Sequence, residues 1–195
     1  VYLDYAAATP IGSRVADVMK KMEAQAWSNP SALLKEGEMA RKILDEARTS
    51  IARNLHCRVG EVFFTSGGTE AANMAILGTI ARAKRWTRAP HIISSSIEHP
   101  AVLESIKASG AKITLINPQA DGIVNSVSIE KEIKKNTVLI CLMQANNEIG
   151  TIQPVGRVGS IIKKIREEKE LDREEPLLPY PYLLTDASQN ALYED

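Results

Sequence analysis

Hydrophobic positions follow two different patterns along the chain. Over residues 13–26 and 31–55, apolar side chains recur every three or four positions, which predicts two amphipathic helices. Beyond residue 60 the apolar residues gather into short continuous runs, which is typical of strands buried on both faces of a parallel sheet. Five such runs predict five strands, at residues 62–64, 91–93, 113–116, 138–142 and 182–184.

Helical segments are expected between these strands. The alternation of strand and helix predicts an α/β fold with a mostly parallel sheet and helices on both faces. Ser126 or Ser128 would cap the third of these helices. A charged, proline-containing insertion over residues 167–184 is expected to form a surface excursion before the last strand. The helices are expected near residues 69–86, 100–108, 127–135 and 157–168.

Composition narrows the classes of function. The 195 residues are 44% hydrophobic and 25% charged, which suits a globular domain with a core. Basic and acidic residues number 24 each, so the chain has no net charge to attract a nucleic acid or an anionic membrane. No apolar run is long enough to span a membrane and no leader precedes Val1, so a cytoplasmic protein is expected. Cys57 and Cys141 form no CxxC pair, which argues against a disulfide framework and a metal site.

Polar segments follow four of the five predicted strands. The carboxyl ends of parallel strands meet at one edge of a sheet, where open α/β folds bind their ligands. We therefore expect these segments to converge on one ligand. They are Thr65–Glu70, Ser94–Pro100, Gln144–Gly150 and Thr185–Gln189.

The Gly67-Gly68-Thr69 turn suits a phosphate group. Glycine lets backbone N–H groups approach an anion, and the positive end of the following helix dipole lies at the same place. A plain strand-to-helix turn capped by Ser66 or Thr69 is the alternative interpretation of the same residues.

The polar residues at the other strand ends also have local interpretations. His99, before Pro100, suits a helix cap, and Asn146 and Asn147 suit a turn. Asp186 at a strand end would cap the next segment. A shared functional site is favoured only because all of them are expected at the same edge of the sheet.

Five motifs occur in an order that resembles a known family. The set is similar to the cysteine desulfurases of the NifS/IscS type, which are fold-type I pyridoxal 5′-phosphate (PLP) enzymes of the class V aminotransferase group. The resemblance extends over essentially the whole chain. The motifs are Leu3–Pro10, Thr65–Asn73, Glu98–Leu103, Asn146–Gly150 and Asp186–Gln189.

The resemblance implies a role for each candidate site residue. Gly68 and Thr69 would hold the cofactor phosphate at a helix N-terminus. His99 would stack on the pyridine ring and relay protons, which makes it the candidate catalytic residue. Asp186 would pair with the ring nitrogen and keep it protonated, so that the ring acts as an electron sink.

Two further residues complete the implied cofactor site. Gln189 would hydrogen-bond the phenolic oxygen of the ring, and Asn147 would lie near that oxygen and the substrate carboxylate. Family members convert L-cysteine to L-alanine and pass the sulfur on as a persulfide, for iron–sulfur cluster assembly or tRNA thiolation. The resemblance therefore implies L-cysteine as substrate, a sulfur-acceptor protein as partner and a homodimer.

Several parts of the family pattern fall outside this sequence. The lysine that binds the cofactor, the nucleophilic cysteine and the substrate-binding arginine would all lie beyond Asp195. The family's large domain has seven strands in the order 3-2-4-5-6-7-1, of which five are expected here. We therefore expect an N-terminal arm (residues 1–12) and an incomplete PLP-binding large domain (residues 13–195). Such a chain would be inactive and poorly folded without the missing C-terminal half.

Other departures and alternatives stay open. Cys57 and Cys141 are expected to be structural, because Cys141 lies in a buried strand where a thiolate is disfavoured. Leu34 stands where the family usually has a histidine. A selenocysteine lyase or a small-amino-acid transaminase shares the same PLP motifs, and a non-catalytic fragment or scaffold would explain the absent lysine. A plain nucleotide-binding α/β protein fits the phosphate turn but lacks the acidic residue after a second strand.

Overall fold

The computed structural model describes residues 1–171 and 181–191, the side chains of 169–171 excepted. Within it the chain forms two compact units, Val1–Phe64 and Thr65–Asp195. The predicted boundary after residue 12 stays a prediction.

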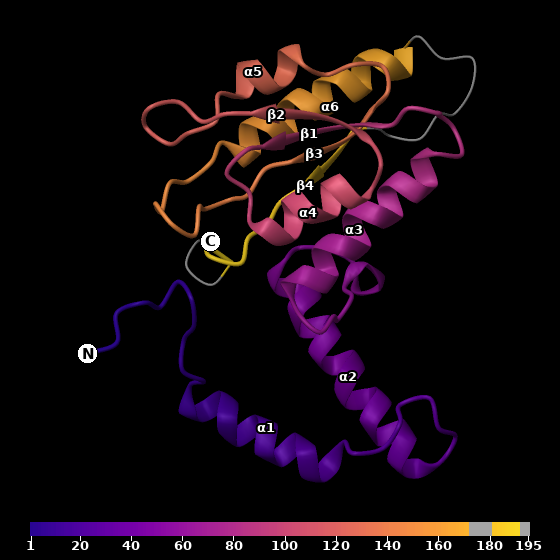
Figure 1. Cartoon of the computed structure of the whole chain (residues 1–195). Helices are drawn as coiled ribbons and strands as arrows, with labels where there is room; N and C mark the ends of the chain where they lie inside the picture. The colour runs from indigo at the N-terminus through magenta and orange to yellow at the C-terminus, as the bar shows by residue number, and fades with distance from the viewer. Residues whose placement is uncertain (172–180, 192–195) are drawn as a thin grey trace. The chain divides into compact units, whose positions relative to one another are not determined.

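The first unit contains the two helices that the sequence predicts. They are α1 (Ser13–Gln25) and α2 (Lys35–Asn54), followed by the short 3-10 helix η1 (Val59–Glu61) (Figure 1). No residue of α1 is buried, and α2 buries only Gly37, Ala40 and Ala52. The apolar stripes of these helices therefore stay largely exposed within the unit.

Gly37 fixes how the loop before α2 meets the helix. A Cβ at this position would lie 2.5 Å from the carbonyl oxygen of Ala32 and 2.9 Å from that of Asn29. Real Cβ atoms do not approach backbone oxygens so closely, so only glycine allows the loop to cross the first turn of α2.

The second unit is a four-stranded parallel sheet covered by helices on both faces. Helices α3 and α4 lie against one face, and α5 and α6 lie against the other (Figure 1). This arrangement confirms the predicted α/β fold with a parallel sheet. The elements are α3 (Gly68–Ala83), β1 (His91–Ser95), α4 (Pro100–Ala108), β2 (Lys112–Ile116), α5 (Ser126–Lys131), β3 (Thr137–Cys141), α6 (Val155–Leu171) and β4 (Tyr182–Leu184).

Two hydrophobic cores sandwich the central strands. Successive side chains of β1 point to opposite faces, so Ile92 packs with α3 and α4 while Ile93 packs with α5 and α6. In β3, Leu139 and Ile140 divide in the same way. Near-continuous burial of these two strands explains why their sequence shows apolar runs rather than alternation.

A buried histidine ties the amino ends of three strands together. The ring of His91 in β1 contacts the hydroxyl of Thr137 in β3 at 2.8 Å and that of Thr114 in β2 at 2.9 Å. Burial lowers the pKa of His91, and nearby Lys134 lowers it further. A neutral imidazole serves this position because one ring nitrogen donates while the other accepts.

The strand order agrees with the family resemblance. The sheet runs β2-β1-β3-β4. If residues 62–64 are counted as the first predicted strand, this order reads third, second, fourth and fifth. These four strands therefore have the neighbours that the family order implies.

The first predicted strand, Val62–Phe64, is wrong: these residues form no strand in the structure. A strand is stabilised by ladder hydrogen bonds, and here the carbonyl of Val62 accepts instead from the Arg48 side chain at 3.3 Å. Arg48 also lies 5.3 Å from the ring centre of Phe64, and Phe63 is 71% exposed. The described residues thus supply four strands rather than the five expected.

Two smaller expectations also differ from the structure. β2 is an edge strand, so Ile113 and Leu115 are partly exposed rather than buried on both faces. The cap of α5 is Asn125, whose side chain accepts from the Val127 N–H at 2.9 Å, and not Ser126 or Ser128.

Part of the predicted insertion over 167–184 is described and part is not. Helix α6 continues to Leu171, further than the expected end near residue 168. Residues 172–180 lie outside the described part of the chain, so the expected surface excursion is not tested there. Among the described residues, no helix combines the length and apolar character needed to cross a membrane.

Replacing Ile93 by alanine tests the core between β1 and the α5/α6 layer. Ile93 is fully buried, and such truncations remove packing and leave a cavity. We expect the free energy of unfolding to fall by about 2–5 kcal/mol. Ile113→Ala on the edge strand is the matched control and should cost clearly less. Denaturant unfolding of both variants measures the difference, and equal losses would contradict the described core.

Candidate cofactor site

Helix α3 begins with a turn that carries no side-chain cap. Its N-cap is Gly67, and neither Ser66 nor Thr69 makes a capping hydrogen bond to the first turn. The Glu70 carboxylate, in the first turn, instead accepts from the Ser66 N–H at 2.6 Å, and hydrogen bonding by the Ser66 side chain and backbone lowers the pKa of Glu70. No side chain therefore caps the start of α3 at Gly67 and Gly68.

A cavity of about 400 Å³ joins this helix start to the segment after β4. Gly68 lines it together with Asp186, Ala187 and Ser188. A Cβ on Gly68 would stand 3.9 Å from the Ser188 hydroxyl, in ordinary contact. The remaining walls are mostly apolar and come from α3, α4, β4 and the segment after β4: Ala71, Ala72, Ala75, Val102, Leu184, Thr185 and Ala191.

Asp186 is held at this cavity by the continuation of the sheet. Its carbonyl accepts from the Gln144 N–H at 2.9 Å, one step beyond the last β3–β4 pair. Its carboxylate accepts from the Ser188 N–H at 3.0 Å and from the Ser188 hydroxyl at 2.6 Å. The side chain is thus fixed locally, as expected of a cap, and also lines the cavity.

His99 is the N-cap of α4. Its Nδ1 accepts from the Ala101 N–H at 3.1 Å, and Pro100 occupies the first helical position. The proton of a neutral ring therefore lies on Nε2. The ring is exposed and does not line the cavity described above.

Asn146 organises the loop after β3. Its Oδ1 accepts from the N–H groups of Glu148 and Ile149, both at 2.9 Å, and its Nδ2 donates to the Ile97 carbonyl at 3.1 Å. Asn146 is therefore buried as a structural residue, as the turn interpretation expects. The neighbouring Asn147 is half-buried in the same loop.

Glu98 is a buried acid that the sequence analysis passed over. It is 4% exposed, and its Oε1 accepts from the Ser95 hydroxyl at 2.5 Å and from the Met143 N–H at 2.8 Å. Its Oε2 is buried without a hydrogen-bond partner among the described residues. Burial raises the pKa of Glu98, and the Asp186 carboxylate raises it further. The residues around Glu98 in sequence do not indicate this burial, because its partner Met143 lies 45 residues away.

Gln153 likewise has distant partners that the sequence does not reveal. It is buried, its Oε1 accepts from the Val124 N–H at 2.9 Å, and its Nε2 donates to the Gly122 carbonyl at 2.9 Å. These bonds hold the segment before α5 against the residues that follow the Asn146 loop. Gly122 adopts a φ of +79°, and a Cβ there would lie 2.7 Å from Ile149.

The predicted site residues all lie beyond the carboxyl edge of the sheet or at the start of α3. The structure brings Gly68 and Asp186 together at the cavity. Thr69 follows Gly68 in the first turn of α3, and Gln189 is half-buried in the turn after β4. Thr69, His99, Asn147 and Gln189 do not line the cavity. The cofactor roles of all six residues stay predictions.

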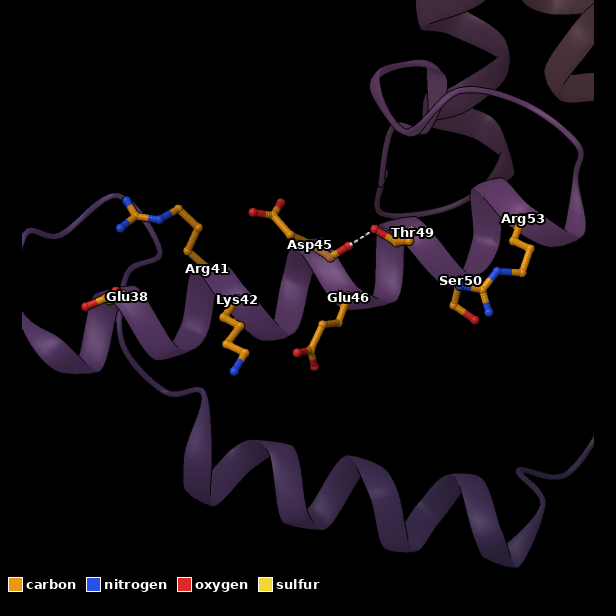
Figure 2. A pocket seen from close by; sticks show the side chains of 8 residues that line it. All are labelled: Glu38, Arg41, Lys42, Asp45, Glu46, Thr49, Ser50 and Arg53. Carbon is orange, nitrogen blue, oxygen red and sulfur yellow. Dashed lines mark hydrogen bonds between the residues drawn. The ribbon is translucent and has the colours of Figure 1, made fainter.

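A second hollow, of about 640 Å³, lies along α2 in the first unit. Figure 2 shows that its eight side chains all project from this one helix, and no predicted site residue is among them. The side chains are exposed and of both charges, and Thr49 bonds back to the Asp45 carbonyl at 2.7 Å. This is the solvated face of a helix rather than a ligand site. The residues are Glu38, Arg41, Lys42, Asp45, Glu46, Thr49, Ser50 and Arg53.

The two cysteines differ in environment. Cys141 is fully buried in β3, and burial strongly raises the pKa of its thiol, with Glu98 raising it further. A thiolate is therefore disfavoured there, as the sequence analysis expects. Cys57 is half-buried in the first unit.

A parallel α/β sheet with a helix N-terminus and a carboxylate lining one cavity at its carboxyl edge suits a phosphate-bearing cofactor. The family model of the aminotransferases of class V matches residues 1–168. The chain therefore belongs to the class V aminotransferase family, as its motifs predict. The cofactor of this family is pyridoxal 5′-phosphate.

Relatives and solved structures agree with this assignment. The chain is 41% identical over 167 residues to "Cysteine desulfurase IscS" of Dictyoglomus turgidum, a match that covers 84% of this chain and 42% of the relative. It is 38% identical to "Putative cysteine desulfurase IscS 1" of Bacillus subtilis, with 84% and 44% covered. The solved structure of a "NifS-like protein" superposes with a TM-score of 0.84 at 34% identity, covering 97% of this chain and 49% of that one. The chain thus spans about half the length of the relatives it matches.

Thiol labelling tests the burial of Cys141. We expect an aromatic disulfide reagent to label Cys57 in the native protein, whereas Cys141 reacts only after unfolding, because its pKa keeps it a thiol through neutral pH. Counting released chromophore in the parent and in Cys57→Ser measures both sites. Rapid labelling of Cys57→Ser under native conditions would contradict the buried position of Cys141.

Proposed function

We propose that this chain is the amino-terminal, PLP-binding part of a cysteine desulfurase. The observation that carries the proposal is the cavity that both the uncapped start of α3 and Asp186 line. The curated relatives that match the chain are named as cysteine desulfurases, and one matching solved structure, at 34% identity, is titled "SspA in complex with cysteine". L-cysteine is accordingly the proposed substrate.

The chemistry of the cavity suits pyridoxal 5′-phosphate. This cofactor has a phosphate group at one end, a basic ring nitrogen at the other and an apolar ring between them. The helix start at Gly68 offers backbone N–H groups to an anion, and the missing side chain leaves room for close approach. Asp186 offers a negative charge, and alanine and valine side chains line the wall between them.

Each of these residues has a defined task in the proposal. Gly68 and Thr69 bind the phosphate with backbone and hydroxyl donors, which fixes the cofactor's position. Asp186 holds a proton on the ring nitrogen, and the hydrogen bonds from Ser188 orient its carboxylate. When bound, the protonated cofactor ring supplies an electron sink for chemistry at the substrate α-carbon.

The loops after β1 and β3 supply the remaining groups. Nδ1 of His99 accepts from the Ala101 N–H, so the proton of the neutral ring lies on Nε2. The ring would stack on the bound cofactor, and its Nε2–H would be the hydrogen-bond donor. Asn147 and Gln189 donate to oxygens of the cofactor or the substrate. The part of the protein that corresponds to the other half of the relatives supplies the lysine, the nucleophilic cysteine and, in a homodimer, the partner surface.

Borohydride reduction followed by intact-mass measurement tests the proposal on the protein isolated from cells that express its complete gene. Reduction converts a reversible lysine–PLP bond into a stable adduct. We expect a species larger than the 21.4 kDa of this chain, either continuous with it or as a companion, that carries one PLP group. Release of alanine and sulfide from L-cysteine then separates a desulfurase from a transaminase. No adduct on any chain would favour the scaffold interpretation.

Asp186→Ala tests the proposed pairing with the ring nitrogen. Loss of the carboxylate removes the stabilisation of charge on the ring, so we expect the turnover rate in the complete protein to fall by about a hundredfold or more. PLP affinity should change much less, because the phosphate contacts remain. Glu130→Ala on the exposed surface of α5 is the control. Near-normal alanine formation by Asp186→Ala would remove this role from Asp186.

A further inference from the structure

Two loops at the carboxyl edge of the sheet are joined by buried side chains rather than by backbone pairing. Glu98, after β1, accepts from the Met143 N–H at the end of β3 at 2.8 Å. In return Asn146, after β3, donates to the Ile97 carbonyl at 3.1 Å. These two bonds set the loop that ends in His99 against the loop that contains Asn147.

The hydrogen bonds of Glu98 fall unevenly on its two oxygens. Oε1 accepts from both the Ser95 hydroxyl and the Met143 N–H, which fills the two lone pairs of a carbonyl oxygen. Oε2 has no hydrogen-bond partner among the described residues, although Glu98 is only 4% exposed. A charge left on such an oxygen would cost far more free energy than an unpaired hydroxyl there.

The charges around Glu98 point the same way. The titratable group that acts on it is Asp186, after β4, whose carboxylate adds to the effect of burial in raising the pKa of Glu98, while the hydrogen bonds from Ser95 and Met143 oppose the rise. Among the described residues, no basic side chain contributes to its ionisation. His99 follows it in sequence but is exposed. Of two neighbouring carboxyl groups, the more buried one retains the proton, and Asp186 is only half-buried.

We propose that Glu98 is a positioning residue of the cofactor site that works as a neutral carboxylic acid. This role rests on the proposed function, because the two loops that Glu98 joins carry the proposed cofactor-binding residues His99 and Asn147. The carbonyl oxygen of Glu98 binds the two loops together. Its uncharged state means that the Asp186 carboxylate, which lines the cavity, has no second charge repelling it from the loop after β1.

Infrared difference spectroscopy tests the proton on Glu98 directly, in the complete protein. We expect a protonated-carboxyl C=O band in the parent at pH 7 that is absent from Glu98→Gln and present in the exposed control Glu130→Gln. This readout depends neither on PLP nor on stability. Absence of the band in the parent would overturn the neutral state.

The pH dependence of unfolding gives a second readout with a defined sign. Burial raises the pKa of Glu98 in the folded chain above the ordinary value of 4.5, which applies to the unfolded chain. At a pH between the pKa of the unfolded chain and that of the folded chain, the unfolded chain has lost the proton that the folded chain keeps. The unfolding constant of the parent, divided by that of Glu98→Gln, should therefore rise by up to about tenfold per pH unit in this window. Glu130→Gln should show no such trend. A ratio that is flat or falls with pH would mean that Glu98 is ionised.

PLP affinity tests the positioning role. Measured well below each variant's unfolding temperature, the affinity of Glu98→Gln should stay within about twofold of the parent, because glutamine keeps the accepting oxygen and is neutral. Glu98→Met keeps the volume but loses both hydrogen bonds, and we expect it to bind PLP at least tenfold more weakly. Equal affinity in Glu98→Met, or a large loss in Glu98→Gln, would overturn the role. If Glu98→Met does not fold, a large loss of affinity in Glu98→Gln would still overturn the role.

The same measurements separate this inference from the proposed function. A parent that binds no PLP would overturn the proposed function and, with it, the purpose given to Glu98. A parent that binds PLP with an ionised or dispensable Glu98 would overturn only the inference.

Discussion

The parallel pairing of β1 with β3 is the constraint on which the candidate site depends. Both strands are buried on both faces, and their register sets Ile92 against Leu139 and Ile93 against Ile140. Because the strands run in the same direction, the segments that follow them emerge at the same edge. β4 joins on the other side of β3, and the ladder continues through the Gln144 N–H to the Asp186 carbonyl. Asp186 is therefore placed by the backbone of the sheet.

At that edge the backbone ladder ends, and hydrogen bonds of buried polar side chains hold the loops together instead. Glu98 and Asn146 join the loops after β1 and β3, while Gln153 holds the segment before α5. Each such group loses its hydration on folding, so each must find partners in the protein or raise the free energy of the folded state. The penalty makes the loop geometry specific, because a displaced loop would leave several buried groups unpaired at once.

The fold was largely predictable because its main determinants are local. Apolar periodicity identified α1 and α2, and continuous apolar runs identified the four strands of the sheet. Motif order led to the family and to the neighbours of each strand, since a resemblance carries the topology that short-range patterns lack. The run at Val62–Phe64 failed because its apolar residues mark a strand only where a neighbouring strand is present to pair with it. In the described chain, Arg48 occupies the Val62 carbonyl instead.

The candidate site was predictable only in part, for a physical reason that Glu98 illustrates. Gly68 and Asp186 were predicted because their residue types suit a phosphate and a ring nitrogen, whatever surrounds them, and these roles stay predictions. The role of Glu98 depends on the Met143 N–H, 45 residues away, and on an oxygen that no donor among the described residues reaches. A sequence shows that an acid precedes His99, but burial decides whether this acid is charged. The electrostatics of the site therefore follow from packing. Asp186 is the one charged acid of this pair because the buried Glu98 stays protonated.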